Sequence, residues 1–169
     1  MAEKRRVMLV DDEKLIVQGL QRALRPLHDT WEVVAATSGP EALSLLATRP
    51  ADLVISDMRM PEMNGADLLE EVKRRSPGTV RIVLSGQAED AAAFRVLPVA
   101  HRYFSKPTEA AALRAFVARV DTMRNTLPDA SLQAALGALD SLPTPRAIRK
   151  ELSDAFAAGA DERDRKSVV

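Results

Sequence analysis

Acidic residues follow two of the short apolar runs in this chain, at the point where each run ends. Asp11 and Asp12 come directly after Val7–Val10, and Asp57 follows Leu53–Ile55 after a single serine. Carboxylates that are brought together repel one another, which raises their pKa values, and a hard divalent cation relieves the repulsion. Mg²⁺ prefers oxygen ligands and suits one or two carboxylates together with phosphate oxygens. The three acids therefore predict a magnesium site, if the fold brings the two runs side by side.

Two later apolar runs end in groups that could hold an anion. Ser85 follows Val80–Leu84, and Lys106 follows the weaker run Arg102–Phe104 at a distance of one serine. A lysine ammonium is a mobile point charge, and a serine hydroxyl can donate to another oxygen of the same anion. With the carboxylates, these residues predict a site for Mg²⁺ and a phosphoryl group in which one carboxylate is the covalent acceptor. Each residue alone is more often an ordinary turn residue, so the prediction depends on the whole set.

The elements that must position these residues are short apolar runs that alternate with stretches of helical spacing. A further run at Trp31–Ala36 completes five runs whose lengths fit buried strands. This alternation indicates βαβ units and an α/β, flavodoxin-like, doubly wound parallel sheet of strand order 2-1-3-4-5. In that order strands one and three are neighbours, so Asp11, Asp12 and Asp57 converge at the carboxyl edge, where open α/β sheets bind ligands. The predicted helices cover residues 15–27, 41–47, 65–74, 88–96 and 108–125.

Two of the predicted helices raise expectations about where their apolar side chains lie. Leu15 is grouped with later leucines on one face of the first helix, which predicts that it turns inward. The last helix carries an a/d heptad stripe made of Leu113, Phe116, Val120, Met123 and Leu127. We expect Leu113 and Phe116 to pack on the sheet. For Met123 and Leu127, core packing and a contact for dimerisation or tail docking are equally open.

Composition excludes several classes of protein. The 169 residues include 24 Lys plus Arg and 24 Asp plus Glu, so the chain lacks a net field that draws it to nucleic acid or acidic lipid. It has no cysteine, which excludes disulfide scaffolds, thiolate zinc sites and cysteine nucleophiles. No apolar run approaches the roughly 18 residues that span a bilayer, and the run after the basic start is too short for a secretory signal. We expect a cytoplasmic protein that binds no membrane and, as a whole, no nucleic acid.

The chain is expected to divide into one domain at residues 1–125 and a helical extension with a polar tail at 126–169. The Leu-Pro-Asp sequence at 127–129 interrupts the long helix, and shorter helices are predicted at 131–140 and 146–158. Two short helices cannot bury both of their apolar stripes alone, so they must dock on another surface or open a longer module. A DNA-binding helix-turn-helix is disfavoured, because the turn contains two prolines and the basic residues of the extension do not outnumber the acidic ones.

Four strings in this sequence resemble the receiver domain of two-component response regulators, the CheY-like family. The string VISDMRMPEMNG at 54–65 is highly specific in this setting, and the others are VMLVDDE at 7–13, IVLSGQ at 82–87 and YFSKP at 103–107. The resemblance implies Mg²⁺ as cofactor and a sensor histidine kinase or phosphotransfer protein as the phosphodonor. It also implies that the domain catalyses its own aspartyl phosphorylation and slow dephosphorylation, without being an enzyme in the usual sense.

The resemblance assigns roles at the acidic site. Asp57 matches the phosphoacceptor, Asp12 the direct Mg²⁺ ligand, and Asp11 the partner that acts largely through water. Asp57 and the backbone carbonyl of Arg59 complete the metal shell. A haloacid-dehalogenase-type phosphatase also forms an aspartyl phosphate, but it needs a second aspartate where this chain has Arg59. A P-loop enzyme is excluded as well, since no GxxxxGK[ST] string is present.

The resemblance also implies a switch. Ser85 matches the hydroxyl that moves to the phosphoryl group, Lys106 matches the lysine that pairs with that group, and the bond before Pro107 is expected to be cis. Tyr103 matches the aromatic residue that swings inward when Ser85 shifts. The surface of the fourth helix, fifth strand and fifth helix would then change and signal to an output domain or a separate protein.

The identity of the output is less defined. The string at 84–107 resembles receivers that precede HD-related output domains of the HDOD or HD-GYP type, and residues 139–152 are similar to the start of such a domain. Too few residues follow for the whole domain, so the chain could be a truncated form. The alternative is a receiver that binds proteins constitutively, with output through its C-terminal helices, and a homodimer is also open.

Overall fold

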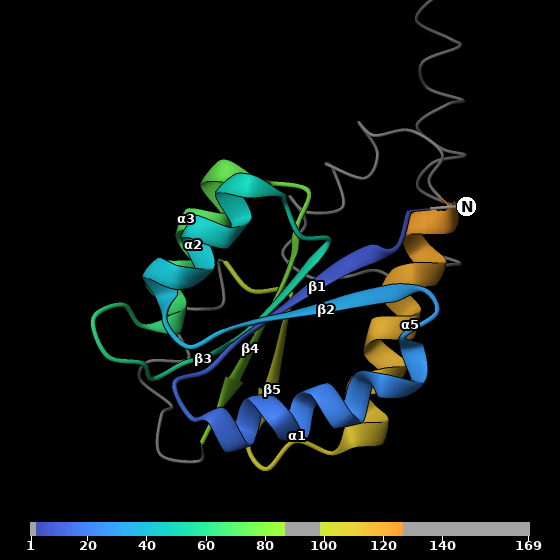
Figure 1. The fold of residues 1–169 in the computed structure, drawn as a ribbon, viewed down its shortest axis with the longest axis horizontal. Coiled ribbons are helices and arrows are strands. Elements are labelled where there is room, and N and C mark those ends of the chain that lie inside the picture. The colour runs from blue at the N-terminus through green and yellow to red at the C-terminus, as the bar shows by residue number, and fades with distance from the viewer. Residues whose placement is uncertain (1–2, 87–98, 127–169) are drawn as a thin grey trace, which may run out of the picture.

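The computed structural model describes residues 3–86 and 99–126 of the chain. They form a five-stranded parallel sheet with helices on both faces (Figure 1). The strands are β1 (Arg5–Val10), β2 (Trp31–Ala36), β3 (Leu53–Asp57), β4 (Val80–Ser85) and β5 (Arg102–Ser105). The helices are α1 (Lys14–Leu24) with the 3-10 turn η1 (Arg25–Leu27), α2 (Gly39–Thr48), α3 (Gly65–Arg75) and α5 (Ala110–Thr126). The helices predicted at 88–96, 131–140 and 146–158 lie outside the described residues.

The strand order is β2-β1-β3-β4-β5, which confirms the predicted flavodoxin-like topology. The register aligns Val10 of β1 with Ser56 of β3, so the two strands end at the same level. Strands β1, β3 and β4 are almost completely buried, because helices cover both faces of the sheet. This burial explains why their sequences are continuous apolar runs rather than alternating ones.

Successive residues of the central strands feed two separate cores, as the two-residue period of a strand requires. Val7 and Leu9 pack with residues of α1 and α5, whereas Met8 and Val10 pack with residues of α2 and α3. Figure 1 shows the same division, with α1 and α5 on one side of the sheet and α2 and α3 on the other. Each strand is therefore held from both faces, which fixes where its carboxyl end lies.

The prediction that Leu15 faces the core is wrong, since its side chain is 78% exposed. At about 100° per residue, Leu15 lies on the opposite side of the helix from Leu24. The buried face of α1 consists instead of Val17, Leu20 and Leu24, whose spacing fits the helical period. Met123 is fully buried in the core of α1 and α5, which decides for core packing between the two roles left open for it. Leu127 lies outside the described residues.

Within the described part of the chain, no helix is long and apolar enough to cross a membrane.

Candidate functional site

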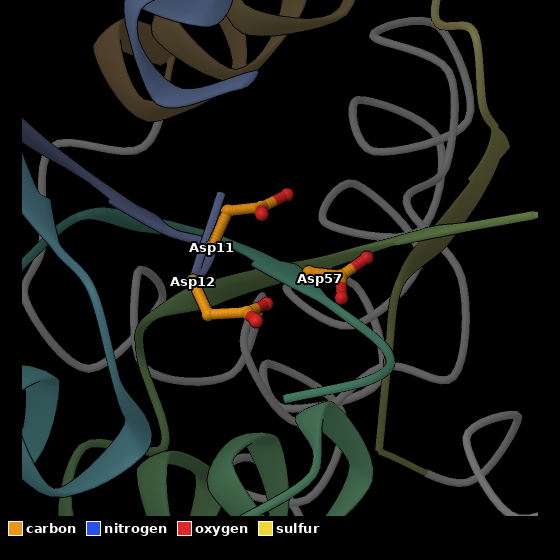
Figure 2. Close-up of side chains that lie close together, drawn as sticks. All are labelled: Asp11, Asp12 and Asp57. Atoms are coloured by element: carbon orange, nitrogen blue, oxygen red, sulfur yellow. The ribbon is translucent and has the colours of Figure 1, made fainter. Parts of the chain in front are cut away.

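The acidic cluster forms where β1 and β3 end side by side. Asp11 and Asp12 follow the last residue of β1, and Asp57 is the last residue of β3. Each offers a carboxylate oxygen, and these oxygens lie within 4.8 Å of one another. Figure 2 shows the three side chains projecting toward the same space from these two strand ends. Asp11 and Asp57 are buried and Asp12 is exposed, so the cluster is open to solvent on one side.

Lys106 brings a positive charge to this cluster from the end of β5. Its Nζ lies 2.8 Å from Oδ2 of Asp11 and 2.6 Å from Oδ1 of Asp57. The backbone N–H of Lys106 donates to the carbonyl of Ser85 at 2.7 Å, which holds the residue against the end of β4. The peptide bond between Lys106 and Pro107 is cis. The structure thus unites residues that are 95 positions apart in the chain.

The carboxylate of Asp57 is held at both oxygens. While Oδ1 faces Lys106, Oδ2 accepts a hydrogen bond from the backbone N–H of Arg59 at 2.9 Å. Asp11 is held in a similar way, since its Oδ1 accepts from the backbone N–H of Glu13 at 2.9 Å. Both side chains are therefore oriented before any ligand arrives.

Electrostatics at the site leave negative charge in excess. Burial raises the pKa of Asp57, the hydrogen bond and charge of Lys106 lower it, and the charge of Asp11 raises it further, so that the net shift is upward. Burial lowers the pKa of Lys106, but its contacts with Asp11 and Asp57 outweigh burial and raise that pKa overall. The lysine is thus firmly charged, yet one ammonium does not balance the crowded carboxylates.

The loop after Asp57 is packed tightly against the cluster. The N–H of Gly65 donates to the carbonyl of Met58 at 2.9 Å. A Cβ on Gly65 would lie 2.1 Å from the backbone oxygen of Asp57, so only glycine fits there. Glu62 in the same loop has a φ of 66°, a left-handed backbone conformation that residues other than glycine rarely adopt. In the sequence, Gly65 begins a predicted helix and ends the string at 54–65, but neither feature indicates its close approach to the backbone of Asp57.

The remaining candidate residues lie on β4, on β5 and in the loop after β3. Ser85 is buried at the end of β4, and its hydroxyl donates to the carbonyl of Gly86 at 3.3 Å. Tyr103 lies on β5 with its side chain 39% exposed, which is an outward position. The side chain of Arg59 is exposed at the mouth of the site.

Comparison with known proteins points to one family. A model of the response regulator receiver domain matches residues 7–118. The hydrogenase transcriptional regulatory protein HoxA of Cupriavidus necator is 32% identical over 157 residues, which are 91% of this chain and 31% of that protein. The transcriptional regulatory protein GlrR of Escherichia coli is 38% identical over 109 residues, which are 63% of this chain and 24% of that protein. The chain spans about a third or less of the length of these relatives.

Solved structures agree with this result. The signal receiver domain of an HD domain-containing protein from Pseudomonas fluorescens is 31% identical with a TM-score of 0.68, covering 73% of this chain and 99% of that chain. The REC domain of AraT, a response regulator from Geobacillus stearothermophilus, is 29% identical with a TM-score of 0.69, covering 75% of this chain and 100% of that chain. The similarity in both cases includes nearly the whole of the solved domain.

Proposed function

Because the chain belongs to the family of response regulator receiver domains, we propose that Asp57 accepts a phosphoryl group from a phosphohistidine on a sensor kinase or phosphotransfer protein. Response regulators as a family interact with sensor kinases and output domains. The observation that supports the assignment to Asp57 is its position between the ammonium of Lys106, at 2.6 Å, and the carboxylates of Asp11 and Asp12. A nucleophile so placed has positive charge beside it and room for a cation.

The donor set fits Mg²⁺, the cation that receiver domains generally bind at an acidic pocket. All three clustered side chains offer oxygen, and the raised pKa of Asp57 reflects burial and repulsion that a divalent cation would relieve. We propose Asp11, Asp12, Asp57 and the backbone carbonyl of Arg59 as the residues that hold it. Bound there, Mg²⁺ would supply positive charge that offsets the charge on the phosphoryl oxygens.

The residues of the chain divide the transfer between them. A carboxylate oxygen of Asp57 forms the new bond to phosphorus as the bond from phosphorus to the donor imidazole breaks. Lys106 pairs with a phosphoryl oxygen, and Ser85 donates its hydroxyl to another once it has moved. Catalysis is thus mainly positioning and charge stabilisation. Water attack on the same acyl phosphate returns Asp57 to its free form.

The phosphorylated form would act as a switch. The modification adds roughly −1.5 to −2 charges at Asp57, which favours rearranged positions of Ser85 and Tyr103. Tyr103 is exposed in this structure, so an inward movement would alter the surface that β5 presents. We propose that this surface passes the signal to an output domain or a separate protein.

We also propose that the phosphodonor docks on α1. A hollow of about 260 Å³ beside Lys106 is lined by α1 and by the start of α5, and the exposed Leu15 stands at its rim. A protein donor must approach this close to reach Asp57, and an apolar helix face on the donor would cover Leu15. A Leu15→Asp variant should then slow phosphotransfer from the kinase and leave phosphorylation by a small donor unchanged. A defect at Asp57 would instead abolish phosphorylation by both donors.

The decisive experiment measures intact-protein mass after incubation with acetyl phosphate and Mg²⁺. We expect one phosphoryl adduct, its loss in Asp57→Asn and in EDTA, and its retention in Asp29→Asn, which removes an exposed carboxylate elsewhere. No adduct in the unmodified chain, even with several kinases supplied, would refute Asp57 as phosphoacceptor. The alternative, a receiver that binds its partner constitutively, predicts that the Asp57→Asn variant keeps full partner binding.

The domain assignment is part of the proposal. We propose that residues 1–125 are the receiver domain and that 126–169 form a separate helical extension. The similarity to the receiver of an HD domain-containing protein supports an extension that opens an output module of that kind. The homodimer and the cytoplasmic location inferred from the sequence also remain predictions.

A further inference from the structure

A hollow of about 290 Å³ lies between β5 and α5, away from the acidic site. We call it the β5/α5 hollow. Two aromatic rings contribute to its lining, those of Phe104 and Phe116, which meet edge to face with centroids 5.8 Å apart. Ala112 and Ala115, both exposed, line it from α5. Small side chains beside aromatic rings leave space into which larger apolar side chains could fit.

The described lining of the β5/α5 hollow also includes basic side chains. Arg102 and Arg119 line it, and the guanidinium of Arg102 lies 5.5 Å from the centre of the Phe104 ring. Among the described residues, its lining includes no carboxylate. An occupant that suits it therefore combines an apolar face with negative charge. A second copy presenting the same hollow would instead bring arginines against arginines.

The end of α5 fixes the point from which the chain continues. Arg124 donates to the carbonyl oxygens of Asp52 and Gly78, and Arg5 pairs with Asp121 at 2.7 Å. The last two turns of α5 are thus anchored to the sheet up to the end of the described residues. The residues after 126 therefore start from a defined place. To reach the hollow, they must turn back along α5 toward its earlier turns.

The segment that follows has the chemistry that the hollow requires. Leu132, Leu136 and Leu139 fit one helical face, and residues 127–140 include Asp129 and Asp140 but no lysine or arginine. Residues 127–130, which contain a proline, give a connection of ordinary length for two antiparallel helices. Ten helical residues span about 15 Å, which is roughly the distance along α5 from its end back to Ala115.

We propose that residues 131–140 fold back as a helix and occupy the β5/α5 hollow. The three leucines lie along α5, with Leu139 nearest to Ala115 and the aromatic rings, and Asp140 lies near Arg102. The extension then shields the β5 and α5 surface from other proteins, so that a partner that reads this surface must first displace it. This proposal goes beyond phosphorylation and does not depend on Asp57 being the phosphoacceptor.

Disulfide trapping in the full chain tests the docking, and the absence of native cysteine makes the result unambiguous. Ala115→Cys combined with Leu139→Cys should form an intramolecular disulfide under mild oxidation, because Leu139 is the leucine that an antiparallel helix brings nearest to Ala115. The control combines Leu139→Cys with Gln21→Cys, which places the second thiol on the exposed side of α1. We expect the Ala115 pair to close at least about fivefold faster, the ratio given by ~1 kcal/mol of docking free energy. Circular dichroism confirms that both variants are folded.

A charge exchange provides the second readout. Arg102→Glu should slow closure of the Ala115 pair, and adding Asp140→Arg should restore the rate. Equal closure rates for the two cysteine pairs would overturn the proposal, as would closure that is insensitive to Arg102. Disulfide-linked dimers formed through Ala115→Cys in place of the intramolecular bond would also overturn it, and would assign the hollow to a second copy.

Discussion

The carboxyl and amino edges of the sheet both bury charged side chains, but they stabilise these charges with different partners. At the carboxyl edge, the buried Asp11 and Asp57 share the single ammonium of Lys106, and Asp12 adds a third carboxylate to the cluster. At the amino edge, Arg124 is 6% exposed and donates to two backbone carbonyls, with its NH1 3.3 Å from the carboxylate of Asp52.

The difference lies in what remains unsatisfied. Carbonyl oxygens accept from Arg124 without repelling one another, so these contacts crowd no like charges together at the amino edge. The clustered carboxylates repel, and the pKa of Asp57 is raised although Lys106 lies beside it. Of these two clusters, the one at the carboxyl edge therefore carries the excess of negative charge. That edge is the one suited to a cation and an anionic ligand, whereas the other stabilises the fold.

The largest effect is expected from a substitution that disrupts the close packing of Gly65 against the carboxyl edge. Gly65→Ala would place a methyl group 2.1 Å from the backbone oxygen of Asp57, so the start of α3 must move. We expect the free energy of unfolding to fall by about 3 kcal/mol in urea denaturation. Gly19→Ala is the matched control, because its new methyl meets no atom within 4 Å and α1 should gain about 0.5–1 kcal/mol. Equal effects of the two substitutions would contradict the close approach at Gly65.

The next largest effect is expected from removing the hydrogen bonds of Arg124 at the amino edge. Arg124→Met leaves the carbonyls of Asp52 and Gly78 without this donor, and we expect the free energy of unfolding to fall by about 2 kcal/mol. Arg74→Met serves as the comparison, since Arg74 is 70% exposed and its ion pair with Glu71 is screened by solvent. Denaturant titration should show a change within about 0.5 kcal/mol for that variant. A similar loss of stability in both variants would mean that burial does not determine how much these arginines contribute to the free energy of unfolding.

A substitution of opposite sign sharpens the comparison. Burial raises the pKa of Asp57, so ionisation of this carboxyl is less favourable in the folded chain, and stability is lost as pH rises through the raised pKa. At pH 7 in EDTA, Asp57→Asn should therefore increase the free energy of unfolding by about 1 kcal/mol. Asp52→Asn, at the amino edge, should decrease it, because Asp52 accepts from the N–H of Arg6 and faces Arg124. A loss of stability in Asp57→Asn would refute the excess of negative charge at the carboxyl edge.

The smallest effect concerns an ion pair outside both edges. Hydrogen bonds from Arg74 and Arg75 lower the pKa of Glu71 to about 2. A carboxyl whose pKa is lowered on folding stabilises the fold at pH values above its ordinary pKa of 4.5. This contribution is lost as the pH falls toward 2. The stability difference between the unmodified chain and Glu71→Gln should thus be small at pH 7 and shrink over that interval. An NMR titration that places the pKa of Glu71 near 4.5 would contradict the proposed effect of Arg74 and Arg75.

Much of the fold could be predicted because its elements have local signatures. The five strands appear as short apolar runs, and the strand order that follows from alternating strands and helices is confirmed. The convergence of Asp11, Asp12 and Asp57 was predictable for the same reason, since parallel neighbours end at one edge. The error at Leu15 arose from grouping leucines whose spacing does not fit 3.6 residues per turn, while Val17, Leu20 and Leu24 do fit it.

The sequence by itself determined which residues could do chemistry and at which strand ends they stand. Only the tertiary structure decided that Lys106 bridges Asp11 and Asp57, that Gly65 presses against the backbone of Asp57, and that Met123 is core rather than interface. It also decided that Arg124 clamps the amino ends of β3 and β4. The physical reason is that periodicity and turn chemistry act over a few residues, whereas these contacts join residues far apart in the chain and exist only once the sheet has brought them together.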